Sequence, residues 1–227
     1  MSSLLEAPPS PVSSYDESPV SLRTLEDLMG ELGRIPLSRV RLSPLIGQAT
    51  EADLFHVNGK HCELVDGVIV ERSFDFWASR VATTLLTLGD SWMMTNPIGF
   101  GVSGGVQIRL REGLVRTPSA CFVHWDRIGS KRIPRDPIAT VIPNFVLEMV
   151  GHFNTSDEMA RKRDEYFAAG VELVWIVHPR QEIVEVWTTS RDCHIAGIDD
   201  TLDGGTVLPG FTVSIREWFQ RAKRGQA

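Results

Sequence analysis

Residues 143–151, PNFVLEMVG, place a single acid in a strand that is otherwise apolar on both faces. Side chains alternate between the two faces of a strand, so Glu148 shares one face with valines. The opposite face is formed by Phe145, Leu147 and Met149. A strand with two apolar faces is covered on both sides, which is typical of a central strand with helices packed above and below the sheet.

A carboxylate buried in such a strand needs a partner, because an unpaired one costs several kcal/mol or takes up a proton. One explanation is a structural ion pair with an arginine. The other is a metal site with a second carboxylate nearby, for which the natural place is just after Pro118, in the buried strand predicted at 114–123. There the chain has Ser119, on a face that would meet Glu148 from a neighbouring strand. A neutral hydroxyl is a poor ligand for a hard divalent cation.

A lysine follows on the next predicted helix. Thr155 and Glu158 form a capping-box pattern that begins this helix, and Gly170 is a suitable residue to end it. Lys162 lies three residues after Met159 and four before Tyr166, on the side expected to face the core. A helical lysine is usually solvated. Behind a strand glutamate, a core-facing lysine is a candidate for stabilising a developing negative charge.

The remaining pattern predicts a mixed α/β protein with one central mixed β-sheet flanked by helices. Glu63 begins the clearest hairpin, in which Asp66-Gly67 favours a type I′ turn. The motif GFGVSGG at 99–105 is expected to be a flexible turn and not a nucleotide-binding loop, since a strand-like alternation follows it where a helix would be needed. The other elements are short capped helices beginning at Thr24 and Thr50, a helix at about 74–94, strands at 106–110, 171–179 and 182–189, the last at the edge or on the outside, and a final short helix near 214–219.

Composition divides the chain into four predicted parts. Residues 1–20 are rich in Pro and Ser and predict a disordered tail, because ordering them costs more entropy than their burial recovers. A helical N-terminal extension at 21–60, a main domain at 61–220 and a basic C-terminal tail at 221–227 follow.

The net charge of −6 argues against a dedicated, strongly basic nucleic-acid binder, although not against one local basic patch. Such a patch is formed by Arg127, Lys131, Arg132 and Arg135, which are equally compatible with a solvated loop. The three cysteines form no CxxC pair and the histidines show no zinc-binding spacing, so a zinc site is not indicated. With no leader pattern and no apolar run of spanning length, a cytoplasmic location is expected.

Five segments, taken in order, resemble the PD-(D/E)XK nuclease superfamily and, within it, the Uma-two family of restriction endonucleases. The segments are ELVDGVIVE, VRTPSACFVHWDRI, PNFVLEMV, RKRDEYFAAGVELVWIVHP and LPGF, and the resemblance runs from about Leu22 to Phe219. It implies a restriction-endonuclease-like core and a metal-dependent DNA endonuclease activity, and a homodimer would suit the cutting of both strands of a duplex.

The resemblance also implies roles for individual residues. Glu148 and Glu63 match the acids that hold Mg²⁺ or Mn²⁺, and Lys162 matches the family's catalytic lysine. The family's metal-binding aspartate is replaced by Ser119, which predicts a weakened metal site and impaired hydrolysis. Three hypotheses follow: an impaired endonuclease, an inactive nuclease fold that binds nucleic acid or regulates, and a structural domain in which these charges only pair with each other.

Overall fold

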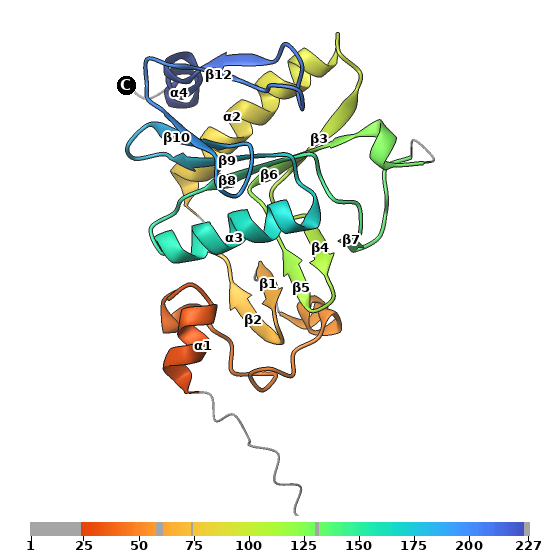
Figure 1. Ribbon diagram of the computed structural model, residues 1–227, viewed down its shortest axis with the longest axis vertical. Coiled ribbons are helices and arrows are strands. Elements are labelled where there is room, and N and C mark those ends of the chain that lie inside the picture. The colour runs from red at the N-terminus through yellow and green to blue at the C-terminus, as the bar shows by residue number, and fades with distance from the viewer. Residues whose placement is uncertain (1–23, 58–60, 74, 130–131, 225–227) are drawn as a thin grey trace, which may run out of the picture.

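The computed structural model describes residues 24–57, 61–73, 75–129 and 132–224. The predicted disordered tail at 1–20 lies outside these residues. Two β-sheets are arranged one above the other in Figure 1, with α3 between them. The mixed α/β class is therefore confirmed, while the single predicted sheet is replaced by two large sheets and a small third one.

The larger sheet has the strand order β11-β10-β9-β8-β6-β3. Strands β8 and β9 run parallel, and the other neighbouring pairs run antiparallel. The segment 182–189, predicted as a strand at the edge or on the outside, forms β10, which lies between β9 and β11. The edge strand on that side is β11. The bounds are β3 (Gly99–Ser103), β6 (Ala120–His124), β8 (Phe145–Met149), β9 (Leu173–His178), β10 (Ile183–Trp187) and β11 (Cys193–Ala196).

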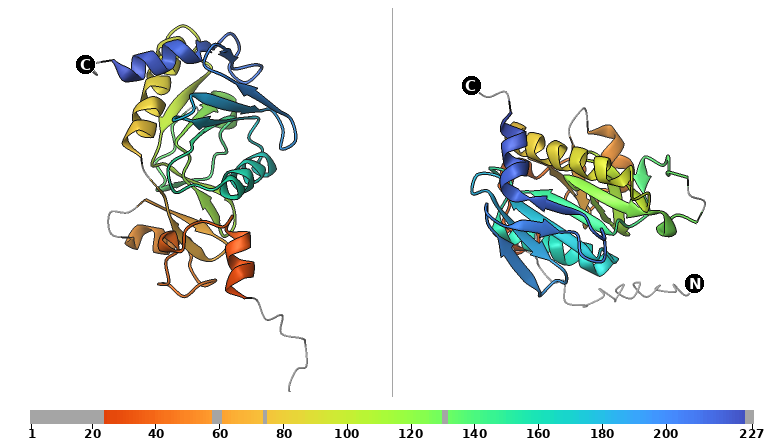
Figure 2. Two further views of the ribbon diagram at one scale, coloured as in Figure 1. Left: turned by 90° about the vertical axis from the view of Figure 1, so that its left-hand side faces the viewer. Right: turned by 90° about the horizontal axis from the view of Figure 1, so that it is seen from above.

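Helices cover both faces of this sheet, as the alternation in β8 predicts. Figures 1 and 2 show α2 (Phe76–Met93) and α4 (Ile215–Lys223) on one face and α3 (Ser156–Ala169) on the other. Phe145, Leu147 and Met149 pack with apolar residues of α2, whereas Val146 packs with Met159 and Tyr166 of α3. Helix α4 ends three residues beyond the predicted boundary of the C-terminal tail, at Lys223.

The second sheet has the strand order β2-β1-β5-β4-β7. Its hairpin turns at Asp66 and Gly67, both with positive φ (49° and 79°), as a type I′ turn requires. The bounds are β1 (Cys62–Val65), β2 (Val68–Glu71), β4 (Gln107–Arg111), β5 (Leu114–Arg116) and β7 (Ile138–Ala139). Three helices precede this sheet in the chain: α1 (Leu25–Glu31), η1 (Leu37–Arg39) and η2 (Glu51–His56). A short helix, η3 (Trp125–Arg127), follows β6. The small third sheet consists of β12 (Thr201–Asp203) paired with β13 (Thr212–Ser214).

The prediction of one buried strand at 114–123 is wrong. The segment forms β5 in one sheet and β6 in the other, and Thr117, Pro118 and Ser119 cross between them. Pro118 cannot donate to a sheet ladder, so it favours a break in pairing at this point. The crossing places Ser119 at the junction of the two sheets.

The prediction of a flexible turn at 99–105 is also wrong for its first part, which is strand β3. The glycines there serve close packing. A Cβ atom on Gly99 would lie 2.2 Å from the carbonyl oxygen of Val123 on the paired strand. Among the residues that the structure describes, no helix combines the length and apolar character needed to cross a membrane.

Candidate active site

The four predicted site residues come from three different elements and from the crossing segment 117–119, and they meet at the junction of the sheets. The Ser119 hydroxyl donates a hydrogen bond to Glu148 Oε2 of β8, at 3.3 Å. Lys162 Nζ of α3 donates to Glu63 Oε1 of β1 at 2.9 Å and to Glu148 Oε1 at 3.5 Å. The expected contact between position 119 and Glu148 is therefore present, and Lys162 faces the core as its spacing predicts. The catalytic and metal-binding roles of these residues stay predictions.

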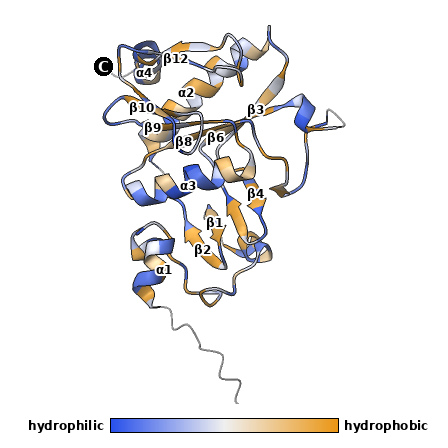
Figure 3. Cartoon of the chain, in the orientation of Figure 1, coloured by the Kyte–Doolittle hydropathy of each residue, from blue (hydrophilic) through white to orange (hydrophobic). Residues whose placement is uncertain are grey.

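Helix α3 lies between the two sheets and brings polar side chains to their junction (Figures 1 and 3). Figure 3 shows α3 as largely hydrophilic, although the larger sheet above it and β1 and β2 below are apolar. Thr155 caps its first turn by accepting from the Glu158 backbone N–H, at 3.0 Å. Gly170 ends it with a φ of 102°, a conformation that suits glycine. These ends fix the turn of the helix that carries Lys162 and Tyr166.

The carboxylates are almost completely enclosed: Glu63 has an exposed fraction of 0%, and Glu148 and Lys162 have 2% each. Arg116, also buried, donates to Glu63 Oε2 at 2.9 Å and pairs with Glu165 at 2.7 Å. An enclosed charge is tolerated only with such partners.

Three cations determine the ionisation of Glu63. Burial raises the pKa of its carboxyl group, but the attraction of Lys162, Arg116 and Arg72 outweighs burial and holds that pKa well below its ordinary value. Burial lowers the pKa of Arg116, but the negative charges of Glu63 and Glu165 raise it by more. The net shift of this pKa is upward, so the guanidinium stays charged. Glu63 and Arg116 therefore form a charged pair near neutral pH.

Tyr166 is a fourth donor at the site. Its hydroxyl donates to Glu148 Oε1 at 2.6 Å. Burial, followed by the negative charge of Glu148, raises the pKa of Tyr166 well above its ordinary value. The hydroxyl therefore remains protonated and acts as a donor.

Arg72, like Arg116 and Tyr166, is a site residue that the sequence prediction missed. It follows β2, and its side chain is 8% exposed. The guanidinium Nη2 donates to the Ser119 hydroxyl at 3.3 Å and lies 3.6 Å from Glu148 Oε2, while Nε lies 3.8 Å from Glu63 Oε1. The Asp66-Gly67 turn could have pointed to Arg72 from the sequence. A two-residue turn sets the register of the hairpin so that Glu63 pairs with Val70. Position 72 therefore projects beside Glu63 on the same face of the sheet.

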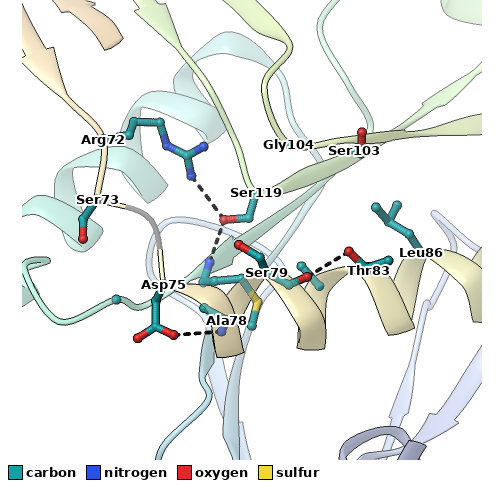
Figure 4. A pocket seen from close by; sticks show the side chains of 13 residues that line it. Arg72, Ser73, Asp75, Ala78, Ser79, Thr83, Leu86, Ser103, Gly104 and Ser119 are labelled. Atoms are coloured by element: carbon teal, nitrogen blue, oxygen red, sulfur yellow. Dashed lines mark hydrogen bonds between the residues drawn. The ribbon is translucent and has the colours of Figure 1, made fainter. Parts of the chain in front are cut away.

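A cavity of about 290 Å³ opens beside Arg72 and Ser119 (Figure 4). Among the described residues, Arg72 and Ser119 line it, whereas Glu63, Glu148 and Lys162 lie behind them and do not. The rest of the lining is rich in hydroxyl groups and includes Ser73, Ser79, Thr83 and Ser103. A molecule in this cavity would therefore meet Arg72 and Ser119 before any carboxylate of the site.

The predicted basic patch is divided. Arg127 donates to the carbonyl oxygens of Gly170, at 2.9 Å, and Ile142, at 3.2 Å, and it pairs with Glu172. These bonds anchor its loop to the end of α3. Arg132 and Arg135 are exposed, and Lys131 lies outside the described residues. Contact of this patch with DNA stays a prediction.

The donor set does not fit a divalent cation. Within the described ranges, no group of three or more His, Cys, Asp or Glu side chains is arranged to hold a metal ion. All four oxygens of Glu63 and Glu148 already face a cationic or hydroxyl partner, with Thr117 N–H as a further donor to Glu63. Mg²⁺ binding requires carboxylate oxygens that are open to the ion.

Comparisons with known proteins identify a family and a solved structure of similar fold. The Uma2 family model, described as "Putative restriction endonuclease", matches residues 52–216. The fold is similar to the crystal structure of a putative nuclease belonging to DUF820 from Anabaena variabilis ATCC 29413, with a TM-score of 0.62. The two chains are 14% identical, and the match covers 71% of this chain and 90% of the other. No curated protein matches the sequence.

Proposed function

The chain belongs to the Uma2 family of restriction endonucleases, and on that premise we propose that it is a DNA-directed nuclease in which phosphodiester hydrolysis is impaired. The family and the fold support a nuclease acting on nucleic acid. The impairment is supported by the chemistry of the residues around position 119. A homodimer that spans both strands of a duplex stays a prediction.

The observation that carries this proposal is the set of bonds made by Ser119. Its hydroxyl accepts from the Met149 backbone N–H at 3.1 Å and from Arg72 Nη2 at 3.3 Å, and it donates to Glu148 Oε2. All its hydrogen-bonding capacity is directed to neighbouring protein groups. Ser119 thus holds Glu148 behind the wall of the cavity and offers no charge to a ligand.

Hydrolysis of a phosphodiester needs an activated water and compensation of the charge that develops on the phosphate. Lys162 is the predicted residue for the second task, but it lies between Glu63 and Glu148 and behind the cavity wall. In this arrangement it stabilises the two carboxylates. Because the donor set does not fit Mg²⁺ or Mn²⁺, neither ion has a part in the proposed chemistry of the chain as it stands.

The cavity favours a second candidate function, namely binding of nucleic acid without cleavage. Arg72 supplies guanidinium N–H donors at its wall, and Ser79 of α2 supplies a hydroxyl group (Figure 4). Such donors suit phosphate oxygens. A charged hydrogen bond of this kind contributes about 1.5–3 kcal/mol, which corresponds to roughly a tenfold or larger change in affinity.

Nicking of supercoiled plasmid, in Mg²⁺ and separately in Mn²⁺, tests the proposed impairment. We expect the natural chain to cut no faster than Glu148→Gln, since the metal-dependent reaction is lost in both. Glu148-dependent cutting by the natural chain, more than about tenfold above the variant, would show that the proposal is wrong.

Fluorescence anisotropy with a short labelled duplex in EDTA tests the binding function. We expect saturable binding that Arg72→Gln weakens roughly tenfold and that Arg34→Gln, at an exposed ion pair with Asp157, leaves unchanged. Equal affinities of the natural chain and Arg72→Gln would rule out the cavity as the binding site.

A further inference from the structure

We propose that Arg72 takes the place of the divalent cation in this site, so that the protein itself supplies the positive charge that a metal would supply. The inference rests on the proposed function, because it concerns the same site. It goes further in assigning the loss of metal binding to two positions, 72 and 119, where the family resemblance indicates position 119 alone.

The first argument is the position of the guanidinium. Arg72 faces the three predicted ligand positions together, at 3.3 Å from Ser119, 3.6 Å from Glu148 and 3.8 Å from Glu63. Figure 4 shows its side chain directed toward Ser119 at the cavity wall. A cation that bridged the same three positions would compete with this side chain for space and for carboxylate oxygens.

The second argument is that the charges of the two carboxylates are compensated without a metal. Glu63 and Glu148 pair with three bases, Arg72, Arg116 and Lys162, and Glu165, the second partner of Arg116, is itself paired with Arg161. A divalent cation added to this site would bring two further positive charges into a place with little access to water, which is strongly unfavourable.

The same count predicts how a metal site would be recovered. Ser119→Asp alone adds one negative charge, which Arg72, 3.3 Å from the serine hydroxyl, is placed to neutralise. Arg72→Gln combined with Ser119→Asp removes one base and adds one acid. This change of two charge units matches one divalent ion, and the position vacated by the guanidinium faces Glu63 and Glu148.

Mn²⁺ titration by calorimetry, on four proteins without DNA, tests the inference. They are the natural chain, Ser119→Asp, Arg72→Gln/Ser119→Asp, and the matched control Arg72→Lys/Ser119→Asp, which keeps a cation at position 72. We expect the Arg72→Gln/Ser119→Asp protein to bind one Mn²⁺ per chain, at least about tenfold more tightly than the other three, by analogy with the losses of 10–100-fold seen when the surroundings of metal ligands change.

Stoichiometric binding by the natural chain, or binding by Ser119→Asp as tight as by the double variant, would overturn the inference. So would a folded double variant that binds no Mn²⁺. If the double variant does not fold, the test passes to Ser119→Asp, whose thermal unfolding midpoint should not change with added MnCl₂; an increase would contradict the role of Arg72.

The readout also separates this inference from the proposed function. Tight Mn²⁺ binding by Ser119→Asp, together with a natural chain that does not cut DNA, would remove the role of Arg72 and leave the impairment intact. Glu148-dependent cutting by the natural chain would overturn the impairment itself.

Discussion

At the scale of single residues, Glu63 shows what makes this site tolerable in the interior. Its side chain has no exposed surface, and it accepts from Lys162, Arg116 and the Thr117 backbone. Removing one member of a buried ion pair leaves the other charges without compensation, and such losses cost about 3–5 kcal/mol. The network therefore contributes to folding whether or not it contributes to catalysis.

Glu63→Gln should lower the free energy of unfolding at pH 7 by about 3–5 kcal/mol, because Arg116 and Lys162 lose their shared carboxylate. Urea unfolding followed by circular dichroism measures this. The matched control is Asp126→Asn, whose side chain is 81% exposed and which should change stability by less than about 0.5 kcal/mol. A loss below about 1 kcal/mol for Glu63→Gln would mean that water reaches the site.

At the scale of elements, helix α3 is tied to the N-terminal segment by a second buried ion pair. Arg39 of η1 donates to both oxygens of Glu158, at 2.8 and 2.7 Å, and to the carbonyl oxygens of Glu71 and Phe153. The capping-box prediction for Thr155 and Glu158 is half right, since Thr155 caps the helix while the Glu158 side chain binds Arg39. That partner lies 119 residues away in sequence, beyond the reach of a local pattern.

Arg39→Met should destabilise the protein by about 3–5 kcal/mol, because Glu158 would remain buried without its main partner. Arg34→Met is the matched control on the same N-terminal segment. Its ion pair with Asp157 is exposed, 74% and 52% for the two side chains, and exposed pairs contribute about 0–1 kcal/mol. Thermal or urea unfolding of both variants gives the comparison, and equal losses would contradict the assigned role of Arg39.

Local chemistry predicts the elements of this chain well wherever a cap or a turn residue marks an end. The Thr24 and Thr50 capping boxes, the Asp66-Gly67 turn and the Gly170 helix end are confirmed. Two features of the structure depend on contacts between distant parts of the chain. The first is the division of 114–123, because the same alternation of side chains fits one strand or two strands in different sheets. The second is the contact of Arg72 with Ser119 and Glu148, which depends on where the chain crosses between the sheets.

At the scale of the whole molecule, the charges make stability depend on pH. The pKa of Glu63 is lower in the folded protein than in the unfolded chain, where a glutamate titrates at about 4.3. Below that pH the unfolded chain takes up a proton that the folded protein does not, so acid favours unfolding. The contribution of Glu63 is complete above that pH and is lost as pH falls toward its folded pKa.

The urea midpoint of the natural chain should therefore begin to fall below about pH 5 and should keep falling as the pH approaches the folded pKa of Glu63. Glu63→Gln should be less stable at pH 7 but should show a shallower fall, because one of the titrating groups has been removed. Other glutamates with lowered pKa, such as Glu158, keep some slope in the variant. Parallel curves for the two proteins would place the acid sensitivity elsewhere.

Over the residues that the structure describes, the chain passes between the two large sheets five times, from β2 to β3, β3 to β4, β5 to β6, β6 to β7 and β7 to β8. Any contiguous segment that contains one large sheet complete therefore also contains strands of the other. Recombination between two related genes therefore cannot replace one large sheet as a contiguous segment without replacing strands of the other. Single substitutions at the junction, such as Arg72→Gln and Ser119→Asp, are therefore the changes that can alter the chemistry of the site while both sheets are kept.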